Sequence, residues 1–268
     1  MEILNIIILI LGCGISYILG SISVARLITS RRKEGNIVNS GSGNPGTMNM
    51  LRNHGIVMGL FTLFCDALKG AIPALFGLLY FGEIDQKLAY IALFLFGLCA
   101  VLGHIFPIFY KFKGGKGIAT TFGVFMVVDP ITSSILFVIL VVILYFTKIG
   151  SLVSLLFITI DGIVQMFKDY ADDNWVMWLL LWTMVLLDYY AHKQNLVRLV
   201  DNAENPADLQ ASINKDINKL KARRTKKAKV ELSTNEEESV VITTDKEKRS
   251  TKKTEDAKNS IKEGKVQK

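Results

Sequence analysis

Long apolar segments fill the first 191 residues of the chain, and they constrain its fold more than any other feature. A helix needs about 20 apolar residues to cross the hydrocarbon core of a membrane. Six segments approach or exceed that length, and a seventh is short. They cover residues 3–28, 56–81, 88–110, 118–128, 131–147, 149–167 and 175–191. The sequence therefore predicts an all-α integral membrane protein.

The stretch 118–147 decides the predicted topology. Counted as one span, it would put the acidic loop 168–174 inside the cell and the basic chain after residue 191 outside. Asp129-Pro130 interrupts it, because proline disfavours helix at the preceding residue and is well placed to start a new helix. Two spans instead place the acidic loop 168–174 outside and the basic chain after residue 191 in the cytoplasm, together with the basic loops 29–55 and 111–117, as the positive-inside rule requires. We therefore predict seven transmembrane helices, one of them short, with an external N-terminus and a cytoplasmic C-terminus.

The last part of the chain differs sharply in composition from the first. Residues 192–268 carry 19 Lys/Arg and 13 Asp/Glu, and hence +6 of the formal net charge of +7. We predict a membrane domain over residues 1–205 and a charged cytoplasmic tail over residues 206–268, partly helical or disordered. Within this tail, a basic helix is expected over Ala207–Lys229 at the membrane surface.

A polar, glycine-rich stretch, residues 39–52, lies between the first two apolar segments and is called the first loop. Glycine lets the backbone take positive φ angles and approach a ligand closely. The stretch offers backbone and side-chain donors but no carboxylate, and such a set suits an anion, most simply a phosphate. Its glycines and side-chain donors include Gly41, Gly43, Gly46, Ser42, Asn44, Asn49 and Arg52.

Two further polar patches share the predicted cytoplasmic side. The second loop, residues 111–117, contains Lys113-Gly114-Gly115-Lys116-Gly117, which resembles a phosphate-binding loop in composition but lacks the Walker A spacing. Lysines are expected at any cytoplasmic helix end, so this motif alone is a weak signal. In the patch 192–198, His192 and Asn195 fall near one face if the segment is helical; an ordinary interfacial helix end is the alternative. All three patches can meet around one site.

Other titratable residues favour structural roles. Asp66 and Lys69 stand three positions apart within a predicted span, where pairing lowers the cost of burying either charge. His104 and Pro107 are expected to shape the helix exit before the second loop. The cytoplasmic patches lack the carboxylate pairs that would hold Mg²⁺, which argues against a metal-dependent phosphotransferase. They supply cations, amides and hydroxyls that can bind two phosphates, but few bases.

In this order and among seven apolar segments, the polar motifs resemble those of the acyl-phosphate-dependent glycerol-3-phosphate acyltransferases of bacteria, the PlsY family. The resemblance covers about residues 1–205. The family transfers an acyl group from acyl phosphate to the 1-hydroxyl of glycerol 3-phosphate, releasing phosphate and giving 1-acyl-glycerol 3-phosphate. The matching stretches are Gly20-Ser21-Ile22, Gly41 to Arg52, Asp66-Ala67-Leu68-Lys69-Gly70, Gly103-His104-Ile105-Phe106-Pro107, Phe112 to Thr120 and His192 to Leu199.

The resemblance implies roles for particular residues and for partners. Acyl phosphate and glycerol 3-phosphate would be the substrates, in contact with membrane lipid, with no cofactor, no metal and no nucleic acid. A functional coupling to the enzyme that makes acyl phosphate is compatible with this reaction. The implied catalytic residues are Ser42, Arg52, Lys116, His192 and Asn195; the implied substrate- and phosphate-binding residues are Gly41, Gly43, Asn44, Asn49, Gly114, Gly115 and Gly117.

The same resemblance implies a multi-pass protein of the bacterial plasma (cell) membrane, with its active site facing the cytoplasm and a role early in phospholipid synthesis. Two features depart from the family pattern: Met48 in the first loop and the polar ending Asp201-Asn202-Ala203-Glu204 after the last motif. Neither is expected to touch the charge-bearing residues.

Two other functions stay open on sequence grounds. A membrane transporter of a small anion or phosphate ester would also place basic loops at a membrane face, but such proteins often show internal repeats and several charged or broken spans. A lipid phosphatidyltransferase would need an acidic metal-binding motif, which the three patches lack.

Overall fold

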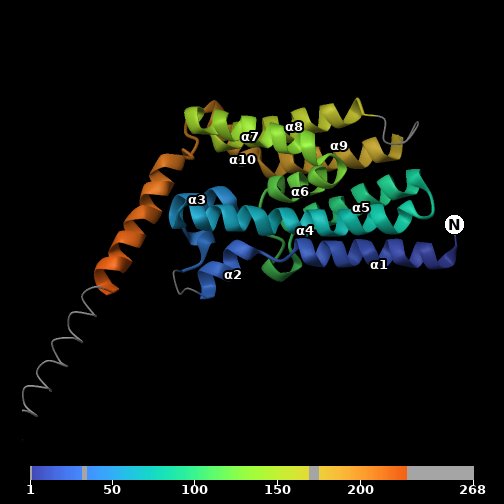
Figure 1. Cartoon of the computed structure of the whole chain (residues 1–268), viewed down its shortest axis with the longest axis horizontal. Coiled ribbons are helices and arrows are strands. Elements are labelled where there is room, and N and C mark those ends of the chain that lie inside the picture. The colour runs from blue at the N-terminus through green and yellow to red at the C-terminus, as the bar shows by residue number, and fades with distance from the viewer. Residues whose placement is uncertain (1, 32–34, 169–174, 228–268) are drawn as a thin grey trace, which may run out of the picture. The chain divides into compact units, whose positions relative to one another are not determined.

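The computed structural model describes residues 2–31, 35–168 and 175–227, and every regular element among them is a helix (Figure 1). For these residues the all-α prediction is confirmed. The chain divides into two compact units, Met1–Asp216 and Ile217–Lys268. The helices of the first unit are α1 (Ile3–Gly20), α2 (Val24–Arg31), η1 (Ile37–Asn39), α3 (Thr47–His54), α4 (Ile56–Gly82), α5 (Gln86–Ile105), η2 (Ile108–Tyr110), α6 (Ile118–Val128), α7 (Pro130–Thr147), α8 (Gly150–Met166), α9 (Trp175–Ala191) and α10 (Lys193–Val200).

Four helices within the described residues are long and apolar enough to cross a membrane, and three further apolar helices are shorter. The long ones cover residues 3–20, 56–82, 86–110 (α5 together with η2) and 130–147; the shorter ones are α6, α8 and α9. The count of seven crossings and the orientation of the termini remain predictions. Residues 32–34 and 169–174, which belong to two of the loops used to orient the chain, lie outside the described residues.

The first apolar segment was expected to form one helix over residues 3–28, but the structure divides it into two helices. α1 ends at Gly20, residues 21–23 are not helical, and α2 begins after them. A Cβ at Gly20 would collide with the backbone carbonyl of Ala100 on α5. Glycine therefore allows α1 and α5 to cross closely at the point where α1 ends.

Prolines set two other helix boundaries. α5 ends at Ile105, before Pro107, and so stops short of the expected residue 110. The expected break at Asp129-Pro130 is confirmed, because α6 ends one residue before Asp129 and α7 begins at Pro130. Asp129 caps α7 by accepting a hydrogen bond from the backbone N–H of Thr132 at 3.2 Å.

Small residues let the central helices approach closely. α4 packs against α5 and α6, and α5 packs against α1 and α9 (Figure 1). A Cβ at Gly77 of α4 would press on the backbone of Ala92 in α5, and one at Gly70 would collide with Thr120 of α6. Within lipid, where apolar burial does not drive helix association, close packing of this kind holds helices together.

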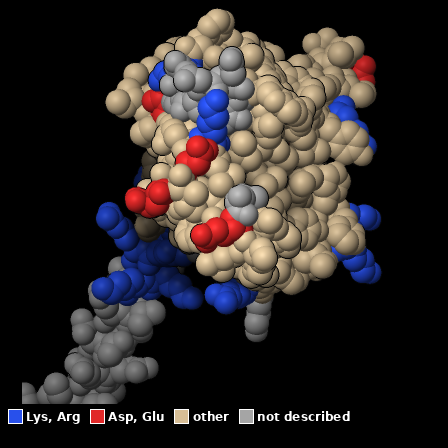
Figure 2. Space-filling model, turned by 90° about the vertical axis from the view of Figure 1, so that its right-hand side faces the viewer, with Lys and Arg blue, Asp and Glu red and all other residues tan. Residues whose placement is uncertain are grey.

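The outer helices expose apolar side chains. Ile3 of α1 is 78% exposed, and Ile131 and Phe146 of α7 are 72% and 77% exposed. Figure 2 shows that most of the face it presents is uncharged. Apolar surface of this extent is unfavourable in water and fits contact with lipid.

The polar stretch between the first two long helices contains a helix of its own. α3 lies inside the expected loop 29–55 and carries Arg52 in its last turn. Gly55, with φ +98°, separates α3 from α4. That backbone conformation disfavours any residue with a Cβ, so glycine permits the sharp junction that places Arg52.

Most of the described part of the tail is helical. Residues 209–227 are helical and lie within the basic helix expected over Ala207–Lys229. The described part of the second unit, residues 217–227, carries six Lys/Arg. Its contact with a membrane surface remains a prediction, and residues 228–268 lie outside the described part of the chain.

Candidate functional site

A cavity of about 230 Å³ is bordered by α3, α4, α6, α7, α8 and the turn before α10, and is called the site cavity. Its wall combines polar side chains with an apolar surface that includes Leu60, Phe122, Phe137, Leu140 and Phe157. All three polar patches reach it. The predicted site residues that border it are Ser42, Asn44, Asn49, Arg52, Lys116, Gly117, His192 and Asn195. The other four, Gly41, Gly43, Gly114 and Gly115, lie elsewhere in the described part of the chain.

Asn49 holds the first loop together from within. It is fully buried, and its Nδ2 donates to the backbone carbonyls of Ile37 at 3.1 Å and Ser40 at 3.0 Å. Its Oδ1 accepts from the backbone N–H of Ser42 at 3.1 Å and from Asn53 Nδ2 at 2.9 Å. These four bonds use the two donors and two lone pairs of the amide. Although Asn49 borders the site cavity, its capacity is used inside the loop, where it fixes the backbone at Ser42.

Gly41 and Gly43 shape this loop through their backbone. Their φ angles are +57° and +72°, in the left-handed region that favours glycine. A Cβ at Gly41 would also collide with the side-chain amides of Asn49 and Asn53. Both glycines therefore support the turn that carries Ser42 to the cavity.

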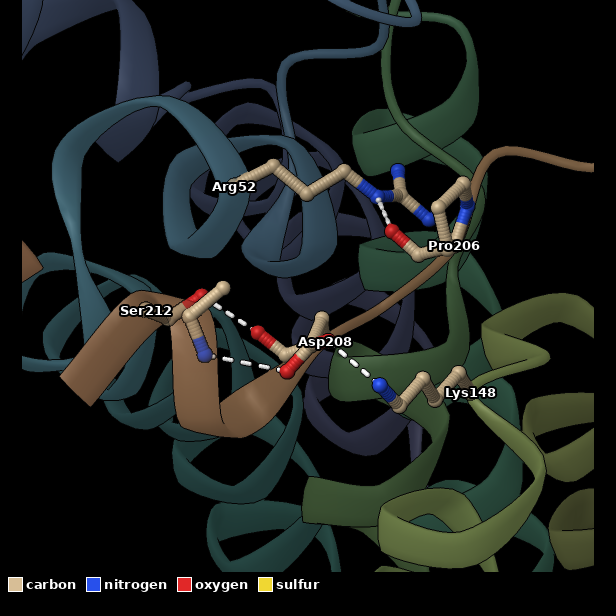
Figure 3. Close-up of polar contacts among 6 residues, drawn as sticks. Arg52, Lys148, Pro206, Asp208 and Ser212 are labelled. Atoms are coloured by element: carbon tan, nitrogen blue, oxygen red, sulfur yellow. Dashed lines mark hydrogen bonds and ion pairs between the residues drawn. The ribbon is translucent and has the colours of Figure 1, made fainter. Parts of the chain in front are cut away.

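Arg52 reaches the cavity from the last turn of α3. Its Nε donates to the carbonyl of Pro206 at 2.7 Å (Figure 3). Its Nη2 donates to the carbonyl of Asn205, also at 2.7 Å. Burial lowers the pKa of Arg52, which the nearby Glu204 carboxylate partly offsets. Arginine stays charged at any physiological pH, so the cavity has a permanent cation here.

Lys116 is the second cation at the site cavity. Its ammonium donates to the side-chain oxygen of Asn195. Burial lowers the pKa of Lys116 to about 8; Glu204 raises it, and Arg198 and Arg52 lower it further. A lysine with this pKa is mostly charged at pH 7 and mostly neutral above pH 8.

His192 and Asn195 are both buried at the start of α10, where His192 is the N-cap residue. The Nδ1–H of His192 donates to the backbone carbonyl of Asp188 at 2.8 Å, which fixes the tautomer in which Nε2 is an acceptor. Burial and the Lys116 charge lower the pKa of His192 to about 4. The imidazole is therefore neutral at pH 7, with Nε2 able to accept a hydrogen bond.

Glu204 belongs to the site, contrary to the expectation that the ending Asp201-Asn202-Ala203-Glu204 would not touch the charge-bearing residues. Its Oε1 accepts from Asn195 Nδ2 at 2.8 Å, and its Oε2 lies 3.6 Å from Arg198 Nε. Glu204 thus orients Asn195, whose oxygen faces Lys116. Met48, the other departure from the family pattern, also borders the cavity. The contact between Glu204 and Asn195 could not be found from helical periodicity, because the chain turns back after α10.

Gly114 and Gly115 pack against α5 instead of bordering the site cavity. A Cβ at Gly114 would collide with the backbone carbonyl of His104, and one at Gly115 with the His104 ring. The backbone N–H of Gly115 donates to the carbonyl of His104 at 3.0 Å. These glycines let the second loop fold tightly against the end of α5, which positions Lys116 and Gly117.

The buried pair of Asp66 and Lys69 forms as expected, with 2.8 Å between Lys69 Nζ and Asp66 Oδ1. Lys69 Nζ also donates to the carbonyl of Ile22 at 3.1 Å, which ties α4 to the break between α1 and α2. His104 Nδ1 lies 3.9 Å from the same carboxylate oxygen. Asp66 and His104 border the site cavity as well.

The arrangement suits two phosphate groups beside an apolar chain. Arg52 and Lys116 provide positive charge, Ser42 a hydroxyl, and Asn44 an amide. Charge-assisted hydrogen bonds from such groups to phosphate oxygens are short and strong. The apolar wall next to them can accept hydrocarbon.

Known proteins resemble the chain over this same unit. A family model described as glycerol-3-phosphate acyltransferase matches residues 8–202. The chain is 32% identical over 209 residues to the glycerol-3-phosphate acyltransferase of Finegoldia magna, covering 76% of this chain and 98% of that protein. It is 35% identical over 202 residues to glycerol-3-phosphate acyltransferase 2 of Bacillus anthracis, covering 75% and 98%.

Two crystal structures of PlsY, an integral membrane glycerol 3-phosphate acyltransferase, are also similar. The glycerol 3-phosphate form has a TM-score of 0.66 and 31% identity, covering 74% of this chain and 94% of that chain. The lysophosphatidic acid form has a TM-score of 0.66 and 30% identity, covering 76% and 97%.

Proposed function

The chain belongs to the glycerol-3-phosphate acyltransferase (PlsY) family, and we propose that it transfers a fatty acyl group from acyl phosphate to the 1-hydroxyl of glycerol 3-phosphate. The products are 1-acyl-glycerol 3-phosphate and phosphate. One observation carries this proposal: two cations from separate polar patches, Arg52 and Lys116, border one cavity whose remaining wall is largely apolar. Both proposed substrates carry a phosphate, and one carries a long hydrocarbon chain.

Arg52 and Lys116 are the proposed phosphate ligands. In the reaction, the hydroxyl oxygen of glycerol 3-phosphate bonds to the acyl carbonyl carbon, and the bond from that carbon to the phosphate oxygen breaks. Negative charge grows on the carbonyl oxygen and on the leaving phosphate. Fixed cations and N–H donors that already point at these atoms lower the barrier, because they need no reorganisation during the reaction. Acyl phosphate is already activated, so the step requires no ATP.

His192 and Asn195 are proposed to position glycerol 3-phosphate. With Nδ1–H donating to the Asp188 carbonyl, His192 Nε2 can accept a hydrogen bond from the attacking hydroxyl. Its low pKa makes it a weak proton acceptor at neutral pH. We therefore favour a substrate phosphate oxygen as the proton acceptor, with His192 as the competing candidate. A His192→Gln protein with near-normal kcat would exclude the histidine-base version.

The apolar wall is proposed to hold the start of the acyl chain. Phe122, Phe137 and Phe157 pack together in edge-to-face and stacked contacts beside the polar residues. Burying hydrocarbon there gains about 0.8 kcal/mol per CH₂ group. This need for contact with hydrocarbon explains why phosphate chemistry is placed in a membrane protein.

The predicted topology completes the proposal. Seven crossings would place the site cavity at the cytoplasmic face of the bacterial plasma membrane, where water-soluble glycerol 3-phosphate is available. Cysteine substitutions at Lys113 and Glu83, probed with a membrane-impermeant thiol reagent in cells after replacement of the three native cysteines, test it. Labelling at position 83 alone is expected; labelling at position 113 alone would reverse the orientation.

The function is tested with the purified full-length protein, palmitoyl phosphate and glycerol 3-phosphate in the presence of EDTA. We expect equal amounts of inorganic phosphate and lysophosphatidate. Absence of both products would exclude the acyltransferase proposal. Uptake of glycerol 3-phosphate into protein-containing vesicles without acyl transfer would support the transporter alternative instead.

A further inference from the structure

The segment over residues 203–216, here called the strap, begins directly after the part matched by the family model, which ends at residue 202. It borders the site cavity through Glu204 and Leu209. Its contacts reach α3, the start of α4 and the turn between α7 and α8. The strap therefore connects three elements around the cavity, although no sequence motif marks it.

Backbone carbonyls of the strap hold one edge of the Arg52 guanidinium. Nε donates to Pro206 at 2.7 Å (Figure 3). Nη2 donates to Asn205, also at 2.7 Å. A guanidinium carries five N–H donors in a planar fork, so two parallel contacts fix its plane. Within the described residues, Nη1 makes no hydrogen bond. The outer edge, with Nη1 and the second Nη2 hydrogen, is left for another acceptor.

An ion pair anchors the strap beside these carbonyls. Lys148 Nζ lies 2.5 Å from Asp208 Oδ2, which joins the strap to the turn between α7 and α8 (Figure 3). The backbone N–H of Ala207 donates to the Lys148 carbonyl at 2.7 Å, and Ala207 is fully buried. The hydrogen bond from Lys148 holds the pKa of Asp208 below its usual value. Two contacts on one residue, Lys148, thus fix the strap next to Pro206.

A second anchor joins the strap to the ends of α3 and α4. Lys215 Nζ donates to the carbonyl of Asn53 at 2.5 Å and to that of Arg52 at 3.3 Å. Asp216 Oδ2 accepts from the backbone N–H of Val57 at 3.0 Å. A cation at the carbonyl end of α3 and a carboxylate at the amide end of α4 both match the helix dipoles. The strap is therefore held on both sides of the segment that contacts Arg52.

We propose that the strap is a positioning element for Arg52, and that Lys148 and Asp208 are positioning residues that act through it. The strap turns the free edge of the guanidinium toward the phosphate of a substrate. This inference rests on the proposed function, since it gives Arg52 a phosphate to bind.

The physical reason is preorganisation. A free arginine side chain samples many rotamers, and ordering it on binding a phosphate costs affinity. Two charge-assisted bonds to fixed carbonyls restrict it before the substrate arrives. A carbonyl has no negative charge to compete with phosphate, so it can orient the guanidinium without neutralising it.

The test replaces Asp208 with asparagine, which removes the ion pair with Lys148 but keeps the N-terminal cap of the helix that begins at residue 209. Asp208 Oδ1 accepts from the backbone N–H of Ala211 at 2.9 Å, and asparagine can make the same bond. Asp208→Asn is therefore compared with Asp85→Asn, since Asp85 caps α5 in the same way through Leu88 N–H at 2.8 Å. Lys148→Met removes the charge, and Lys148→Arg keeps it. All variants are full-length and assayed for kcat and for KM of both substrates.

We expect Asp208→Asn and Lys148→Met to raise KM for one of the phosphate-bearing substrates about three- to fivefold, with kcat changed less than about twofold. Lys148→Arg and Asp85→Asn should stay within about twofold of the wild type in both constants. In an Arg52→Lys background, Asp208→Asn should cause no further rise in KM, because a lysine has no planar fork for the carbonyls to orient.

Three results would overturn the inference: an unchanged KM in Asp208→Asn, a lowered KM, which would mean that the strap competes for Arg52, or an equal further rise in the Arg52→Lys background. Calorimetric Kd values for glycerol 3-phosphate and inorganic phosphate on the same variants give the same comparison without turnover. An inactive wild type would instead count against the proposed function, so the two failures are distinguishable.

Discussion

The first and second loops look alike in sequence but use their glycines differently. In the first loop, Gly41 and Gly43 supply positive φ angles, and Asn49 fixes the turn from inside. In the second loop, Gly114 and Gly115 allow the backbone to pack closely against α5, because any Cβ there would collide with His104. The comparison teaches that a glycine-rich, donor-rich loop need not present its glycines to the ligand. In both loops, these four glycines help to place other residues of the loop at the cavity.

Lys116→Met should have the largest effect, since Lys116 is the one lysine of the second loop that borders the site cavity. We expect kcat/KM to fall by about 100-fold or more, as for loss of other preorganised charges at reacting groups. Lys113→Met is the matched control: Lys113 is exposed, and its described hydrogen bonds are through its backbone, whose carbonyl accepts from Arg26 and whose N–H donates to Tyr110. Steady-state assays check both. Equal losses in the two variants would mean that the loop acts through its overall charge.

Asn49→Ala tests the scaffold of the first loop. The change removes the four hydrogen bonds of a fully buried amide and takes the acceptor from the backbone N–H of Ser42, so we expect a loss of about 2–3 kcal/mol in stability. Thermal unfolding in detergent measures it, with Asn39→Ala as a control at an exposed position of the same loop. If Asn49→Ala loses activity at unchanged stability, Asn49 acts on the substrate and is not only part of the scaffold of the first loop.

Gly115→Ala tests the packing role in the second loop. The added methyl group would overlap the His104 ring, and overpacking of this kind costs about 1–3 kcal/mol. Gly14→Ala on α1, where a Cβ meets nothing within 4 Å, should be neutral or slightly stabilising. Thermal unfolding curves of both variants in detergent measure this difference in stability. Full stability in Gly115→Ala would refute tight packing against α5.

The pH profile separates the cations of the two loops. Lys116 has a pKa of about 8, so it is charged below that pH and neutral above it, whereas Arg52 stays charged. If phosphate binding needs Lys116 charged, log(kcat/KM) should fall above pH 8 with a slope near −1, or about tenfold at pH 9 relative to the plateau. His192, with a pKa of about 4, should add no step between pH 6 and 9. Lys116→Arg should flatten the decline.

Much of the helix pattern could be predicted because it depends on neighbouring residues. The boundaries of α4, α6, α7, α8 and α9 lie within two residues of the expected apolar segments. The expectation was wrong where a contact distant in sequence intervened, as at Gly20, where α1 ends against Ala100 of α5. The short helix α3 was missed, since its residues are polar and show no apolar periodicity.

Part of the site was also predictable, because its residues lie in short motifs of contiguous residues. The resemblance to the acyltransferase family implies Ser42, Arg52, Lys116, His192 and Asn195 as site residues, and the structure brings all five to one cavity, where their catalytic roles remain proposals. Glu204 was dismissed because it lies beyond the motif and shows its contact with Asn195 only after the chain turns back. The strap has no motif at all, because it acts on Arg52 through backbone carbonyls that every residue possesses.

The sequence by itself determined that this chain is a helical membrane protein with three polar, donor-rich patches, because apolar segment length and local charge are properties of contiguous residues. Only the tertiary structure decided which donors face the cavity and which serve the scaffold. Asn49 and Arg52 are both donors of the first loop, yet one is saturated by its own loop and the other is held by a segment more than 150 residues away. Hydrogen-bond partners distant in sequence make that difference, and no local pattern encodes them.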